Sequence, residues 1–153
     1  MSDRFCALLV ICVSVCPTLA AQSRWDRQVD ARITQAGATL RGRAYRLAGL
    51  VGRGTLNTGE SATFSITLPA GAESALTGVC DDDCADLELS LSTNGYDIDA
   101  ARGGGNAPIV RVTPVAPTIY MITVRMASCR LNPCWFAVAA FRQASTTPRP
   151  PSR

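Results

Sequence analysis

Alternation of apolar and polar residues is the feature that most limits what this chain can fold into. It recurs in residues 62–68 (ATFSITL), 86–91 (DLELSL) and 119–126 (IYMITVRM). A period of two places successive side chains on opposite faces of a strand. Turn signals, Pro69-Ala70-Gly71 and the hairpin dipeptide Asn94-Gly95, separate these runs. The pattern predicts a mainly β fold, an antiparallel jelly-roll-like β-sandwich.

One segment has a helical period instead. Its apolar residues follow at steps of four, four, three and four, and they are Trp25, Val29, Ile33, Ala36 and Leu40. Ser23 stands where an N-cap is expected, and Gly42 where a helix ends. We therefore predict an N-terminal amphipathic helix over residues 21–43, packed on a β-sandwich domain of residues 44–143. The apolar run CWFAVAAF, residues 134–141, predicts a strand that lies centrally or beneath a cover.

The N-terminus has the order of a secretory signal. A short basic start precedes an apolar stretch, Pro17 and small residues, so we predict a signal peptide of residues 1–20 that is cleaved after Ala20. The apolar stretch is short for a membrane span, although an uncleaved anchor is the alternative. The mature chain is expected to be periplasmic or secreted, with no transmembrane span. Residues 144–153 are proline-rich and are predicted to be a disordered tail.

Signal cleavage would remove three of the seven cysteines and leave Cys80, Cys84, Cys129 and Cys134. An even number of thiols in an exported chain indicates disulfides. Zinc is the alternative, but zinc sites usually have two residues between paired cysteines, whereas the spacers here are three and four residues long.

The pairing of these cysteines is open on energy alone. Local bonds would close short loops, worth roughly 2 kcal/mol each, whereas crossed bonds would close loops worth roughly 4 kcal/mol. Each close pair, however, brackets a chain reversal between two predicted strands. We therefore predict the local pairs, Cys80 with Cys84 and Cys129 with Cys134.

The chain has no lysine and no histidine, which excludes most enzyme classes. Serine–histidine, cysteine–histidine, serine–lysine and Schiff-base chemistry all lack an essential group. We predict a protein that is not an enzyme. The less favoured alternative is a glycan hydrolase that uses paired carboxylates, either Asp86 with Glu88 or Asp97 with Asp99.

Acidic residues cluster around the first cysteine pair, in GVCDDDCADLELSL. Carboxylate oxygens close together in sequence suit calcium, so a calcium site is one hypothesis. Its ligands would be Asp81, Asp82, Asp83, Asp86 and Glu88. The competing hypothesis is a solvated acidic turn that discourages edge pairing, and it is favoured because the spacing matches no established calcium loop. No other cofactor is indicated.

Positive charge is concentrated in residues 24–53, which hold seven arginines, and negative charge in residues 54–101. A nucleic-acid surface is not expected, because aromatic residues are not interleaved with the arginines. We instead expect the arginines to coat the helix and partly offset the acidic sheet. Trp135 and Phe136 should face opposite sides of a strand, so Trp135 is either a ligand platform or is covered by the helix, which we favour.

The segments GTLNTGESATFSITLPAGAESALTGVCDDDCADLELSL, PIVRVTP, YMITVRM and CRLNPCWFAVAAF resemble bacterial secreted domains related to the pre-peptidase C-terminal family. The resemblance covers roughly residues 52–141. It implies a jelly-roll-like sandwich that serves as an accessory module without catalytic residues, and some relatives bind calcium or extracellular polymers. The expected function is therefore a non-catalytic, exported binding or accessory domain whose partner is an extracytoplasmic protein or polymer.

Overall fold

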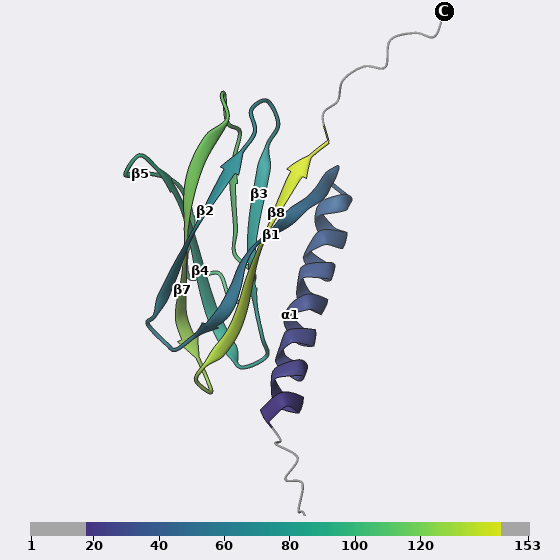
Figure 1. Ribbon diagram of the computed structural model, residues 1–153, viewed down its shortest axis with the longest axis vertical. Coiled ribbons are helices and arrows are strands. Elements are labelled where there is room, and N and C mark those ends of the chain that lie inside the picture. Colours follow the sequence, from purple (N-terminus) through teal and green to yellow (C-terminus); the bar gives the residue numbers. More distant parts are fainter. Residues whose placement is uncertain (1–17, 145–153) are drawn as a thin grey trace, which may run out of the picture.

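The residues that the structure describes form two four-stranded antiparallel sheets and one helix. The computed structural model describes residues 18–144. In chain order the elements are α1 (Thr18–Arg41), β1 (Tyr45–Leu56), β2 (Ser61–Leu68), β3 (Ser74–Cys80), β4 (Cys84–Thr93), β5 (Tyr96–Ala101), β6 (Ile109–Val112), β7 (Thr118–Cys129) and β8 (Cys134–Gln143). Sheet A has the order β1-β8-β3-β6 and sheet B the order β2-β7-β4-β5 (Figure 1). The predicted β-sandwich with one helix is confirmed.

The chain passes back and forth between the sheets, so strands that are neighbours in sequence mostly lie in different sheets. Only β4 and β5 are consecutive in both sequence and space. Asn94 and Gly95 join them with φ values of 50° and 81°, as a tight hairpin turn requires. The jelly-roll detail of the expected sandwich stays a prediction.

The core between the sheets is built from the alternating positions that the sequence sets apart. On β4, Leu87, Leu89 and Leu91 are at most 1% exposed. Tyr120, Ile122, Val124 and Met126 on β7 are also buried. These side chains join one cluster with residues of sheet A, including Leu76 and Phe136. Burial of one face of each strand fixes the register of the sheets.

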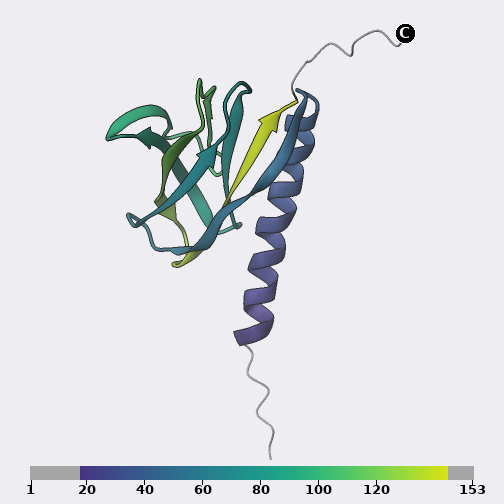
Figure 2. The ribbon, with the colours of Figure 1, turned by 45° about the horizontal axis from the view of Figure 1, so that its top comes forward.

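Helix α1 adds a third layer on the outer face of sheet A (Figures 1 and 2). Leu40 packs with Phe141, Tyr45 and Ala75. Nearer the N-terminus of the helix, Val29 packs with residues of β3 and β8. Sheet A is therefore covered on both faces, which explains why every residue of β3 is buried and why β8 is apolar almost throughout.

Ion pairs hold both flanks of α1 to the sandwich. On one flank, Asp26 and Asp30 pair with Arg53 of β1. On the other flank, Arg32 pairs with Asp82 at 2.7 Å. Two arginines of the basic segment, Arg32 and Arg53, thus have acidic partners. The partner of Arg32, Asp82, belongs to the acidic region of residues 54–101.

The helix differs from the predicted range of 21–43 at both ends, since it begins at Thr18 and ends at Arg41. Ser23 lies inside the helix rather than at its N-cap, because the preceding residues, which include alanines at 20 and 21, continue the helical backbone. No helix within residues 18–144 is both long and apolar enough to cross a membrane. Residues 1–17 of the predicted signal peptide and residues 145–153 of the predicted tail lie outside the described residues.

Candidate binding sites

The acidic segment between Cys80 and Cys84 forms a stapled turn between β3 and β4. The two cysteines are joined by a disulfide, with their Cα atoms 5.9 Å apart. Asp81 is only 1% exposed at the base of this turn. One of its oxygens accepts a hydrogen bond from the backbone N–H of Trp135 at 2.9 Å, and the other has no partner among the described residues. Burial raises the pKa of Asp81 above its ordinary value.

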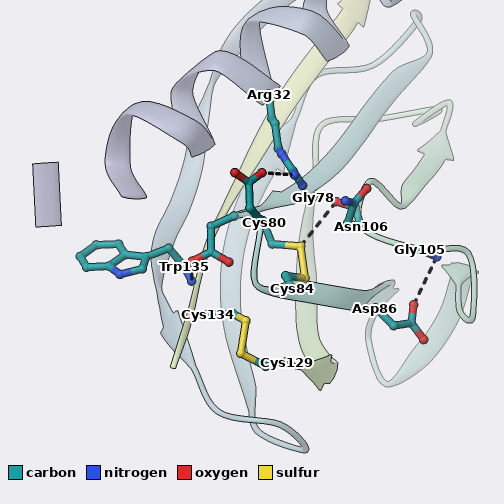
Figure 3. Close-up of a disulfide and its surroundings, with 12 residues drawn as sticks. Arg32, Gly78, Cys80, Cys84, Asp86, Gly105, Asn106, Cys129, Cys134 and Trp135 are labelled. Carbon is teal, nitrogen blue, oxygen red and sulfur yellow. Dashed lines mark hydrogen bonds and ion pairs between the residues drawn. A yellow bond between two sulfur atoms is a disulfide. The ribbon is translucent and has the colours of Figure 1, made fainter. Parts of the chain in front are cut away.

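The other acidic side chains of the predicted calcium set have separate contacts (Figure 3). Asp82 is exposed and pairs with Arg32, and the carboxylate of Asp86 accepts a hydrogen bond from the backbone N–H of Gly105 at 3.3 Å. Glu88 pairs with Arg125 across to β7 at 3.1 Å. The remaining residue, Asp83, is partly exposed, and its carbonyl accepts a hydrogen bond from the backbone N–H of Arg130 at 2.7 Å.

These five residues therefore lie on one loop and one strand, but their side chains do not come together at one point. Within residues 18–144, no three cysteine, aspartate or glutamate side chains lie together in a way that would hold a metal ion. Calcium binding stays a prediction that needs a direct measurement.

Two carboxylate pairs were the alternative acid–base groups. Asp86 and Glu88 lie on β4 with the partners given above. Asp99 accepts hydrogen bonds from the backbone N–H groups of Ala100 and Arg111, at 2.8 Å and 2.7 Å. Asp99 thereby satisfies the backbone N–H of Arg111 on the edge strand β6, so its contacts are structural. Asp97 is exposed on β5.

The second disulfide joins Cys129 to Cys134, again with 5.9 Å between Cα atoms, and staples the turn from β7 to β8. This turn also contacts the loop between β1 and β2. Thr58 donates its backbone N–H to the side-chain oxygen of Asn132 at 2.9 Å, and its hydroxyl accepts from the N–H of Cys129 at 2.9 Å. Both close cysteine pairs therefore staple chain reversals, as their spacing predicts.

Trp135 and Phe136 face opposite sides of β8. Phe136 is 2% exposed in the core between the sheets. Trp135 is partly exposed and packs against the buried cluster that contains Val29 of α1. Figure 3 shows its ring pointing away from both disulfides. The helix therefore covers part of this ring, which leaves a smaller surface for a ligand than a fully exposed tryptophan would offer.

A cleft of about 480 Å³ lies between α1, β3 and the segment that leads into β6. Its apolar lining includes Ala36, Leu40, Val79 and Ile109. Its polar lining is contributed by Arg32, Gln35, Thr39, Thr77 and Asn106. An apolar hollow with a few polar groups is the usual form of a binding site.

Two residues connect this cleft to the acidic turn. Arg32 lines the cleft and also pairs with Asp82, while Asn106 lines it and has its carbonyl oxygen 3.6 Å from the sulfur of Cys80 (Figure 3). No sequence pattern predicts this cleft. Its walls come from three segments that are far apart in the chain, and their residue types are ordinary for a helix, a strand and a loop.

Comparison with known proteins finds similarity among solved structures only. No family model matches the chain. No curated protein matches it either. Among solved structures, the chain is similar to Aeromonas hydrophila PliG, described as a periplasmic lysozyme inhibitor of g-type lysozyme. The TM-score is 0.47 and the sequence identity is 14%, and the match covers 63% of this chain and 88% of that one.

Proposed function

We propose that this protein is an exported, non-catalytic binding domain that takes up part of an extracytoplasmic partner protein in the cleft beside α1. The observation that carries the proposal is the cleft itself. Its volume of about 480 Å³ lies within the range of ordinary ligand sites. The two disulfides support export, because such bonds persist in oxidising compartments.

The lining of the cleft favours binding over chemistry. Arg32 is its charged member, and Asp82 already holds that guanidinium group in place. The remaining polar groups are amides and hydroxyls, which recognise a peptide by hydrogen bonds but do not pair as nucleophile and base. The apolar floor suits an aliphatic or aromatic side chain of the partner.

Site-specific photo-crosslinking in the exporting cell tests the proposal. A photoreactive residue replaces Gln35, which lines the cleft, or Ala38, which is exposed on the same helix outside the cleft lining. We expect one dominant partner to be captured from position 35 and not from position 38. The captured protein is then purified and its affinity for the chain is measured.

A matched pair of variants decides whether the cleft is the binding site. Ala36→Trp fills the cleft and should weaken binding of the purified partner by about tenfold or more. Ala38→Trp adds the same side chain on exposed helix surface and should leave the affinity unchanged. Equal effects of the two variants would refute the cleft as the site. Turnover on a panel of glycans that is lost in Asp86→Asn would refute the non-catalytic assignment.

A further inference from the structure

Two arginines lie directly opposite each other at the end of sheet A that is distant from the acidic turn. Arg46 of β1 is the cross-strand partner of Arg142 of β8. Directly paired residues project from the same face of a sheet, and like charges in such a pair destabilise it. Neither arginine forms an ion pair with another described residue. The pair therefore has a net charge of +2 that no ion pair with another described residue offsets.

The guanidinium group of Arg142 is incompletely satisfied. Its Nη2 donates to the carbonyl of Ala70 at 3.0 Å, while its Nε is buried and has no partner among the described residues. Because this Nε is enclosed by protein atoms, a bound anion can reach the guanidinium group of Arg142 only through its Nη atoms. Glu73, in the loop before β3, does not pair with this group, because its carboxylate accepts from the Tyr45 hydroxyl and pairs with Arg111.

Two hollows meet at this arginine pair. One, of about 330 Å³, runs between β1 and β2, and its apolar walls include Val51, Ile66, Leu68 and Ala140. The other, of about 310 Å³, is lined by Arg46, Leu47, Ala48, Arg142, Gln143 and Ala144. Ala48 and Arg142 belong to both linings. An apolar channel thus adjoins a doubly basic mouth.

We propose that this region binds an anionic amphiphile, a medium-length acyl chain that ends in a carboxylate. The carboxylate lies between Arg46 and Arg142, where it pairs with the exposed guanidinium group of Arg46 and with the Nη groups of Arg142. The acyl chain occupies the hollow between β1 and β2. This site lies at the β1–β8 side of sheet A, whereas the cleft of the proposed function lies at its β3–β6 side, so either can be lost without the other.

Calorimetric titration of the processed protein with decanoate, below its micelle concentration, tests the proposal. We expect saturable binding of one decanoate per chain. Decanol has the same chain without the charge, and acetate has the charge without the chain. Both should bind at least about tenfold more weakly, because each lacks one half of the interaction.

Three variants locate the site. Arg46→Gln removes an exposed charge and should weaken decanoate binding by about tenfold, whereas Arg41→Gln on α1 should not change it. Ala48→Trp blocks the junction of the two hollows from an exposed position and should abolish binding. No saturable binding, equal affinity for decanol, or full binding by the folded Ala48→Trp variant would each overturn the proposal. These variants avoid Arg142, whose bond to Ala70 contributes to folding.

Discussion

Asp81 lies buried at the base of the turn between β3 and β4. It belongs to a run of three aspartates that was interpreted as either a calcium site or a solvated turn. In the structure it is buried, while Asp82 is exposed. The difference arises because the carboxylate of Asp81 points under the turn and accepts the backbone N–H of Trp135. Its role is to hold the turn onto β8.

The raised pKa of Asp81 predicts a specific dependence of stability on pH. A carboxyl group whose folded pKa lies above its ordinary value of 3.8 favours the folded state when protonated. This contribution is complete below 3.8 and is lost as pH rises through the raised folded value. We expect Asp81→Asn to remove that loss, so that its melting temperature falls less than that of the wild type when pH rises from about 3.5 to 7.

Asp97→Asn is the control, since Asp97 is exposed on β5. Melting curves of both variants and the wild type across this pH range give the measurement. If the melting temperatures of the wild type and of Asp81→Asn change in parallel with pH, the burial of an ionisable carboxyl group at this position is contradicted.

The calcium hypothesis has its own measurement at the residue scale. Within residues 18–144 the carboxylates of the set do not gather into a group that would hold a metal ion, so we expect the melting temperature to be the same in millimolar calcium and in chelator. A bound ion at one hundred times its Kd would add about 2.7 kcal/mol, which raises the melting temperature of a small domain by several degrees. A rise of that size would restore the calcium site.

Strand β1 shows how one element depends on a single glycine. Gly52 lies so close to the ring of Phe64 that a Cβ atom at this position would overlap it. The ring cannot move freely, because it packs against Phe136 with ring centroids 6.1 Å apart. The absence of a side chain at Gly52 therefore lets the edge of sheet A approach β2.

Alanine scanning of two glycines in β1 checks this close approach. Gly52→Ala should destabilise the fold by about 1 to 3 kcal/mol, the usual effect of overpacking. Gly49→Ala is the matched control, because a Cβ atom there meets nothing within 4 Å. We expect it to change the free energy of unfolding by less than about 0.5 kcal/mol. Denaturant titration measures both, and equal effects would show that the close contact is not significant.

At the scale of the whole molecule, the disulfides stabilise turns rather than link distant parts of the chain. Each closes a loop of only a few residues, with sequence separations of 4 and 5. The pairing of β1 with β8, the first and the last strand, depends on hydrogen bonds and on the core. The fold should therefore survive the loss of one disulfide.

Replacing Cys129 and Cys134 together by serine should lower the free energy of unfolding by roughly 2 kcal/mol, the chain-entropy value for so short a loop. Denaturant titration, with circular dichroism to confirm retained β structure, measures the change. Loss of all β structure would show that the staple is required for folding itself. The variant with serine in place of Cys80 and Cys84 provides the comparison, because the disulfide that it removes closes a loop of similar length.

Local sequence patterns predict the strands, the helix and the positions of the cysteine pairs. Periodicity is a local property, so Leu87, Leu89 and Leu91 reveal a buried strand face without any knowledge of what covers it. The apolar run of β8 likewise indicated a covered strand. The resemblance to the pre-peptidase C-terminal family stays a prediction.

Only the tertiary structure decided which surfaces come together. The cleft beside α1 needs Gln35, Val79 and Asn106 in one place, and the basic mouth needs Arg46 opposite Arg142. Such contacts depend on sheet order and register, which arise from long-range pairing and leave no periodic trace in the sequence. The burial of Asp81 has the same origin, because its partner on β8 is more than fifty residues away along the chain.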